Sequence, residues 1–356
     1  MTISGLRELT EHRGPFASVY VGTVSDTEDA AQQQRLQVRA VREALSEDGA
    51  QADVLDAVEQ GLADLPPGRA GQAVIADADG LLLAEQLPQP PDRTTTRVSP
   101  MPYLLPMLRL RRATQPHVVA LVDERGADLY TVDAHGVRTD HTLEGTQHPV
   151  HKVRGGGFAH QSMQSRVEET VRRTIDATAE EVERLADHVG AAFVIVAGEI
   201  TARTALGGAL ASHRHHVVQL EGFNRQDPPG RAEFEQRVGQ VIDREAEDHL
   251  HEVAARFEQG SAHELAVQGV PATADALARR NVETLLIEPG SLGDRDVHVG
   301  SDPTFVQADD PRTGDSVRRR ADEALPLAAV AADSEIVVVD PEFGLTEGVG
   351  AVLRHS

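Results

Sequence analysis

The chain has 356 residues, of which 40% are hydrophobic and 26% charged, so two or three domains with ordinary cores are expected. Its formal net charge of −23 disfavours nonspecific nucleic-acid binding over the surface as a whole. The absence of cysteine excludes disulfides, thiolate nucleophiles and cysteine-ligated zinc. No apolar run approaches the roughly 20 residues that span a bilayer, and the first residues lack the pattern of a signal peptide. We therefore expect a cytoplasmic protein with no membrane partner.

The first predicted domain covers residues 1–115 and mixes strands with helices. FASVYVG at 16–22 is typical of a buried strand, and apolar residues follow at helical spacing over 28–47 and 51–64. The run GQAVIADADGLLLAEQL predicts a hairpin, because two apolar strands flank a turn that closes with Asp-Gly. The Pro- and Arg-rich stretch 101–112 is interpreted as a connector.

The second predicted domain covers residues 116–258 and alternates strands with helices. A hairpin is expected over 117–133, and a polar loop rich in His and Gly from about 144 to 162. A long helix, the buried-type strand AAFVIVAG and a short helix come next. A strand at 216–220 and a charged helix at 231–257 end the domain. This alternation predicts a parallel sheet with helices packed on it.

The third predicted domain covers residues 259–356. A helix at 272–280 leads directly into the strand VETLLIE, and a polar loop is expected at 289–316. A helix at 317–332 then precedes the strand SEIVVVD. The sequence thus predicts an α/β fold class with three domains, each of ordinary size.

Four short segments carry a family pattern. They are HKVRGGGFAHQSMQSRVEE at 151–169, AGE at 197–199, GVPATADALARRNVETLLI at 269–287 and EGVGAVLR at 347–354. In this order they resemble the archaeal and eukaryotic peptide-chain release factor 1/Pelota superfamily over residues 116–356. The resemblance implies a central RNase H-like α/β domain with a glycine loop, and a C-terminal α/β domain like that of release factors and Pelota.

The glycine loop departs from the release factors at one position. Their catalytic glutamine, which positions the water that attacks peptidyl-tRNA, falls at Gly157, and glycine has no side chain for this task. Pelota-like proteins also lack the motif and act in ribosome rescue. The organisation of the chain resembles most a bacterial branch, the Balon-like ribosome hibernation factors, which occupy the A site of idle ribosomes together with elongation factor Tu.

The resemblance therefore implies a binding protein and not an enzyme. The expected function is that of a translation factor in ribosome hibernation or rescue during stress, which occupies the A site without hydrolysing peptidyl-tRNA. The expected partners are ribosomal RNA of the A site and peptidyl-transferase centre, and elongation factor Tu. No cofactor, metal or small-molecule substrate is expected.

The same loop is a basic segment in an acidic chain. Residues 151–173 hold five cationic and two anionic side chains, a net charge of +3, and include the one lysine of the chain. Consecutive glycines let a backbone approach RNA closely, while aromatic and amide side chains stack on bases or bind their edges. The predicted rRNA-binding residues are Lys152, Arg154, Gly155, Gly156, Gly157, Phe158, His160, Gln161 and Arg166.

Other functions stay open alongside this one. A peptidyl-tRNA hydrolase, release factor or tRNA nuclease on the same fold is one alternative, and a stress-response scaffold without RNA contact is another. A nucleotide-phosphate loop is disfavoured, because neither GxGxxG nor GxxxxGK[ST] is present. Histidines at 148–151, 213–216 and 249–251 lack HExxH spacing and are expected to be solvated. Basic runs at 109–112 and 318–320 are expected to pair with carboxylates.

Overall fold

The structure is a computed structural model of the chain, and it describes residues 4–22, 30–63, 70–87, 89–111, 115–133, 138–144, 158–210, 215–225, 230–309 and 316–356. Helices and strands mix throughout, which confirms the predicted α/β fold class. The chain forms two compact units: one joins Met1–Ala113 with Ala246–Ser356, and the other is Thr114–Glu245. Every helix among the described residues is too short or too polar to cross a bilayer.

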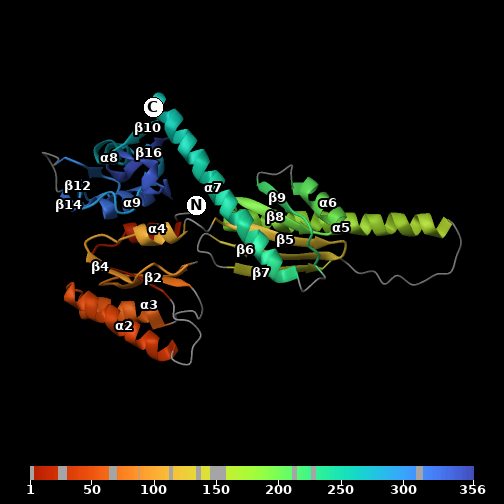
Figure 1. Cartoon of the computed structure of the whole chain (residues 1–356), viewed down its shortest axis with the longest axis horizontal. Coiled ribbons are helices and arrows are strands. Elements are labelled where there is room, and N and C mark those ends of the chain that lie inside the picture. The colour runs from red at the N-terminus through yellow and green to blue at the C-terminus, as the bar shows by residue number, and fades with distance from the viewer. Residues whose placement is uncertain are drawn as a thin grey trace. The chain divides into compact units, whose positions relative to one another are not determined.

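An antiparallel sheet lies between two cores in the N-terminal segment. Its strands follow the order β3 (Gly80–Leu87), β2 (Gly71–Asp77), β1 (Phe16–Gly22) and β4 (Thr95–Ser99). Helices α2 (Ala30–Glu47) and α3 (Ala52–Ala63) cover one face (Figure 1). Because successive side chains of a strand point to opposite faces, Val19 and Val21 pack against these helices, whereas Phe16 and Tyr20 enter the second core. The predicted strand, helices and hairpin are thereby confirmed.

The stretch that was interpreted as a connector is a buried helix, so that interpretation was wrong. The second core receives the elements α1 (Ser4–Arg7), η1 (Glu8–Thr10) and α4 (Leu105–Arg111). Leu105, Met107 and Leu108 of α4 are all buried. Pro106 concealed the helix from the sequence pattern, yet it lies in the first turn, where a missing N–H breaks no helical hydrogen bond.

A mixed sheet forms the centre of the C-terminal segment. Its strands follow the order β10 (Ala266–Gln268), β16 (Val349–Leu353), β11 (Val282–Ile287) and β15 (Glu335–Val338). The helices that cover it are α8 (Val270–Ala278) and α9 (Ala321–Ala331) on one face and the second half of α7 (Arg231–Ala262) on the other. Two single-turn helices, η3 (Pro341–Phe343) and η4 (Thr346–Gly348), connect β15 to β16. Alternate residues of β11 enter the two cores, with Leu285 on the first face and Leu286 on the second.

The polar loop expected at 289–316 contains strands instead. They are β12 (Asp296–Val299), β13 (Val306–Gln307) and, directly after the expected loop, β14 (Val317–Arg320), which form a small antiparallel sheet in the order β13, β12, β14. Helix α9 consequently begins at Ala321 and not at 317. Val297 and Val306 are fully buried in the core shared with α9, and this burial stabilises strands too short to show an alternating pattern.

One continuous core joins the N-terminal and C-terminal segments. It contains Leu6 and Met107 from the N-terminal segment together with Leu277 and Leu325 from the C-terminal one. The division into three domains at 115 and 258 stays a prediction. In the structure, residues of the N-terminal and C-terminal segments are buried in one common core.

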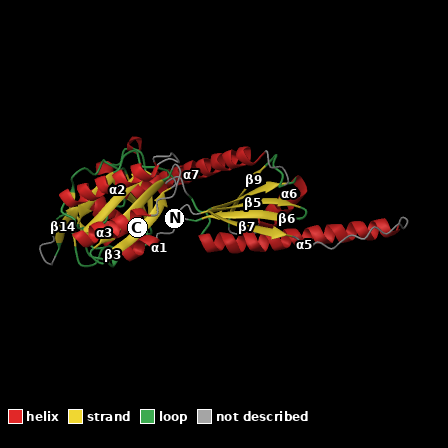
Figure 2. Ribbon diagram, turned by 90° about the horizontal axis from the view of Figure 1, so that it is seen from below, coloured by secondary structure: helices red, strands yellow, loops and turns green. Residues whose placement is uncertain are grey.

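A five-stranded sheet forms the second unit. Its strands follow the order β7 (Arg138–Glu144), β6 (Gly126–Val132), β5 (His117–Asp123), β8 (Phe193–Gly198) and β9 (His216–Leu220). Strands β5, β8 and β9 are parallel, whereas β5, β6 and β7 are antiparallel, which is the RNase H-like order that the resemblance implied. Helices α5 (Phe158–Val189) and α6 (Ile200–Leu210) pack on one face, and the first half of α7 packs on the other (Figure 2). Strand β7 was not predicted, because it is polar and exposed along most of its length.

Candidate functional site

The predicted rRNA-binding segment is divided by the start of α5. Lys152, Arg154 and the three glycines at 155–157 lie outside the described residues. The helix begins at Phe158, four residues before the expected end of the loop. Phe158, His160, Gln161 and Arg166 therefore occupy the first three turns of a helix and not a loop.

The later turns of helix α5 anchor it to its sheet. Ile175, Val182 and Leu185 are buried against residues of β5 and β8, and Val171 is the earliest described residue to pack against this core. The N-terminal end of α5 extends beyond the sheet in both views (Figures 1 and 2). The predicted contact residues on α5 thus lie on a projecting helical end.

Two of the cations counted in the basic segment are paired. Arg172 and Arg173 contact the same carboxylate, that of Glu169, at 2.8 Å and 3.1 Å. These contacts have the i, i+3 and i, i+4 spacings that link neighbouring turns of a helix. Arg172 and Arg173 therefore share one carboxylate on the described part of α5.

The carboxyl ends of the parallel strands are a second candidate site, because ligands of α/β sheets bind at this edge. Asp123 ends β5, and its Oδ1 accepts the backbone N–H groups of Arg125 and Gly126 at 2.8 Å and 3.0 Å. Arg225 contacts the same oxygen at 3.5 Å and Asp128 at 3.0 Å. The carboxylate of Asp123 is thus engaged in closing the β5–β6 turn.

Glu199 follows β8 at the same edge and caps α6. Its two carboxylate oxygens accept the N–H groups of Thr201 and Ala202, each at 3.1 Å. These backbone hydrogen bonds hold the pKa of Glu199 below its usual value. Glu199 is therefore the cap of helix α6.

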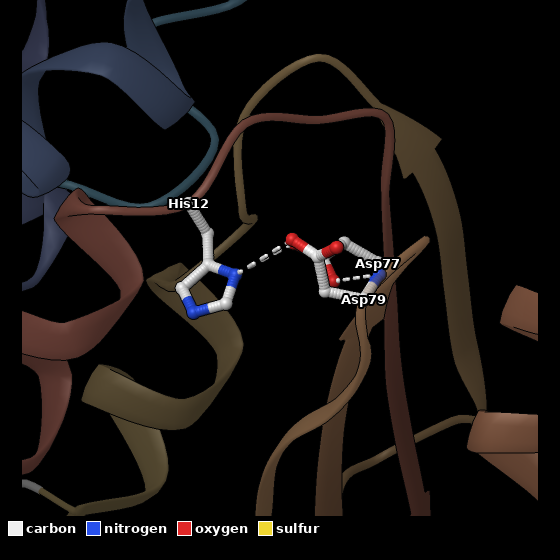
Figure 3. A group of neighbouring side chains, drawn as sticks. All are labelled: His12, Asp77 and Asp79. Carbon is white, nitrogen blue, oxygen red and sulfur yellow. Dashed lines mark hydrogen bonds and ion pairs between the residues drawn. The ribbon is translucent and has the colours of Figure 1, made fainter.

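A third group joins residues that are far apart in the sequence. His12 Nδ1 lies 2.9 Å from Asp77 Oδ2 and 3.8 Å from Asp79 Oδ2 (Figure 3). Asp77 Oδ1 accepts the backbone N–H of Asp79 at 2.8 Å and so fixes the β2–β3 turn. Sequence reasoning missed this group, because it sought metal ligands only among neighbouring histidines. The Asp-Ala-Asp-Gly turn was recognised, but only its fold reveals the histidine beside it.

A buried ionic group lies where the N-terminal sheet meets α9. Arg97 Nη1 donates to Asp322 Oδ2 at 3.2 Å and to Glu323 Oε1 at 3.0 Å, and its guanidinium lies 3.5 Å from the centre of the Tyr103 ring. Burial raises the pKa of Glu323, and Arg97 opposes that shift. This group links strand β4 to the start of α9.

Two further predictions concern a basic run and a histidine, and the structure confirms the first and corrects the second. Arg318 and Arg320 pair with Asp296 and Asp294 at 2.6 Å and 2.8 Å, which confirms that this basic run pairs with carboxylates. The histidine at 249 was expected to be solvated, but it is half-buried and bonds Glu335 at 2.7 Å.

Comparison with known proteins adds a family and several relatives. Residues 116–263 match the family described as bacterial archaeo-eukaryotic release factor family 2. Two proteins of Mycobacterium tuberculosis, the uncharacterized protein MT2704 of strain CDC 1551 and the uncharacterized protein Rv2629 of strain H37Rv, are each 33% identical over 362 residues. Each alignment covers 99% of this chain and 96% of the relative.

Solved structures resemble the chain in fold. The archaeal translation termination factor aRF1 is 16% identical, with 99% of this chain and 98% of that one covered and a TM-score of 0.23. Ribosome-bound archaeal Pelota, from a model with ABCE1, is 17% identical, with 99% and 93% covered and a TM-score of 0.43. Dom34 of Saccharomyces cerevisiae is 12% identical, with 80% and 79% covered and a TM-score of 0.39. At these identities the likeness concerns the fold alone.

Proposed function

The chain belongs to the bacterial archaeo-eukaryotic release factor family 2, within the release factor 1/Pelota superfamily, and from this premise we propose that it is a ribosome-binding translation factor. It occupies the A site as a hibernation or rescue factor and does not hydrolyse peptidyl-tRNA. The loop 151–157 and the projecting end of α5 enter the peptidyl-transferase centre and contact ribosomal RNA.

One observation carries the proposal: a basic glycine loop leads into a helical end that extends beyond its own sheet. A chain with a net charge of −23 needs a local concentration of cations to approach RNA. These cations contact RNA phosphates most readily where the acidic remainder of the protein is kept at a distance, because its carboxylates repel the phosphates. A projecting helix provides that separation, and Lys152, Arg154 and Arg166 provide the charge.

Binding without hydrolysis is supported by the residue at the position where release factors have their catalytic side chain. Gly157 stands where release factors have their catalytic glutamine.

Sedimentation of lysate from stationary cells through a low-salt gradient tests the ribosome contact. We expect the protein to migrate with ribosomes and to return to the top of the gradient as salt increases, because phosphate contacts release counterions. A protein that stays at the top at low salt would contradict the proposal. Crosslinking to RNA tests the alternative of a stress-response scaffold, since a scaffold without RNA contact gives no crosslink.

Charge removal in the loop tests which residues make the contact. Lys152→Ala with Arg154→Ala should weaken ribosome binding and flatten its salt dependence. The matched control is Arg184→Ala in α5, since Arg184 is exposed and bonds Glu181. An equal loss in both variants would show that the loop has no special role.

A release assay with ribosomes that carry peptidyl-tRNA separates the binding protein from a hydrolase. The unchanged protein should free no peptide, and Gly157→Gln should free little or none, because the surrounding residues also differ from those of release factors. Peptide release by the unchanged protein that disappears on changing Gln161 or Gln164 would establish the hydrolase instead.

The third predicted domain, residues 259–356, is proposed to contact a translational GTPase, with elongation factor Tu as the candidate. This step follows from the family, whose members work beside such GTPases. A pull-down with the tagged protein should recover both ribosomal proteins and elongation factor Tu. Recovery of ribosomal proteins alone would remove this partner and leave the ribosome proposal intact.

A further inference from the structure

We propose that His12, Asp77 and Asp79 bind a divalent transition-metal ion, and that Zn²⁺ suits these donors best. The site is independent of the ribosome proposal: its residues belong to the N-terminal sheet, and the basic loop belongs to the other compact unit. It is the one group of three or more such ligands that the described residues bring together.

The three donor atoms are spaced as the ligands of one ion. Zn²⁺ binds nitrogen and oxygen ligands at about 2.0–2.2 Å in a tetrahedron, which sets neighbouring ligand atoms about 3.3 Å apart. His12 Nδ1 lies 2.9 Å from Asp77 Oδ2 and 3.8 Å from Asp79 Oδ2, distances that bracket this spacing. All three atoms lie within 4.8 Å of one another, and the side chains point toward one another in Figure 3.

The chemistry of the donors selects the class of ion. One imidazole nitrogen with two carboxylate oxygens is a mixed set that suits Zn²⁺, and it is too poor in oxygen ligands for Ca²⁺. Three protein ligands leave one tetrahedral position for water or a further ligand. That position is accessible, because the side chain of Asp79 is 82% exposed and that of His12 is 30% exposed.

Burial at the base of the group gives an energetic reason for a cation. The side chain of Asp77 is 1% exposed, and a carboxylate removed from water needs a compensating positive charge. Asp79 adds a second negative charge beside it. A divalent ion at this position would neutralise both carboxylates.

The hydrogen bond of Asp77 to the turn supports its role as a ligand. Its Oδ1 accepts the N–H of Asp79, so Oδ2 is held toward His12. Outer contacts of this kind orient metal ligands. When the ion binds, it replaces the proton between His12 Nδ1 and Asp77 Oδ2, and that proton is released to solvent or carried at Nε2.

The position of the site indicates what the ion would do. His12 lies between η1 and β1, while the two aspartates belong to the β2–β3 turn. Leu6 and Leu9, which precede His12, pack in the core that contains α9. A bound ion would tie this N-terminal segment to the sheet and so hold the shared core together.

Titration of chelator-treated full-length protein with Co²⁺ and Zn²⁺ tests the site. Co²⁺ reports its ligands by visible absorption, and Zn²⁺ binding is followed by calorimetry and by the melting temperature. Asp79→Asn is the decisive variant, because Asp79 is exposed and Asn-Gly keeps a favourable hairpin turn. Asp79→Asn and His12→Gln should each weaken Zn²⁺ binding on the order of 10–100-fold. The matched controls are Asp92→Asn and His216→Gln, because both side chains are exposed and neither belongs to the group.

The outcomes separate a built site from background binding by surface histidines. Loss of one equivalent in both site variants, with the controls unchanged, supports the proposal. Binding that is equal in wild type, Asp79→Asn and the controls, or no Co²⁺ absorption at all, overturns it. If His12→Gln fails to fold, Asp79→Asn alone decides.

Discussion

Arg97 is the residue that connects the N-terminal sheet to α9 by charge. Its side chain is 26% exposed, and the side chain of Glu323 that it contacts is 1% exposed. Arg97→Ala leaves that carboxylate buried without a cation and also removes the contact with the Tyr103 ring. We expect a loss of about 3 kcal/mol in the free energy of unfolding, measured by urea denaturation.

A second variant separates the charge from the packing of Arg97. Arg97→Ala combined with Glu323→Gln should recover part of the loss, because no ionised group is then buried unpaired. Arg39→Ala is the surface control: Arg39 pairs with Glu43, both are exposed, and its removal should leave the free energy of unfolding nearly unchanged. Equal losses from Arg97→Ala and Arg39→Ala would contradict the interpretation.

His249 makes the attachment of α7 to β15 sensitive to pH. Its hydrogen bond to Glu335 raises the pKa of His249, and Thr284 holds the other oxygen of Glu335 at 3.0 Å. A histidine with a raised folded-state pKa contributes stability that is present below its unfolded pKa, near 6.5, and lost as the pH rises through the folded value. The melting temperature of wild type should therefore exceed that of His249→Gln by more at pH 6 than at pH 9. A difference that grows toward pH 9 would contradict this sign.

At the scale of elements, Gly198 decides how β8 passes into α6. It has a φ of +128°, and a Cβ there would meet the carbonyl oxygen of Val122 at 1.9 Å. Gly198→Ala should therefore separate β8 from β5 and cost about 2–3 kcal/mol, measured by chemical denaturation. Gly208→Ala is the control: Gly208 lies inside α6, where a Cβ meets nothing within 4 Å. That change should stabilise by up to about 1 kcal/mol, because alanine favours a helix. Similar effects at both positions would show that the close approach is unimportant.

At the scale of the whole molecule, the shared core predicts how the chain unfolds. Phe16 and Ile75 of the N-terminal sheet are buried in the same core as Leu277 and Leu325. Residues 1–113 expressed alone would expose this face, whereas 114–245 retains both of its own cores. We expect the first fragment to aggregate or remain unfolded, and the second to show a cooperative thermal transition by circular dichroism. Cooperative folding of 1–113 alone would show that the shared core is dispensable.

The sequence by itself determined the elements whose signals are local. Periodic apolar residues predicted β1, α2 and the later turns of α5, and Asp-Gly predicted the hairpin of β2 and β3, because these patterns depend on neighbours in the chain. The four motifs indicated the family, because their residues and their order along the chain can be recognised without knowledge of any tertiary contact. The glycine at 157 was likewise evident from the sequence alone.

The tertiary structure decided what depends on distant partners. The strands β12 to β14 and helix α4 carry weak local patterns, and burial in a core drawn from both ends of the chain stabilises them. The same core joins segments that the sequence pattern had divided. Asp77 and His12 are 65 residues apart, and Arg97 and Glu323 are 226 apart. No periodicity links residues at such separations, because their proximity results only from the packing of the sheet and α9.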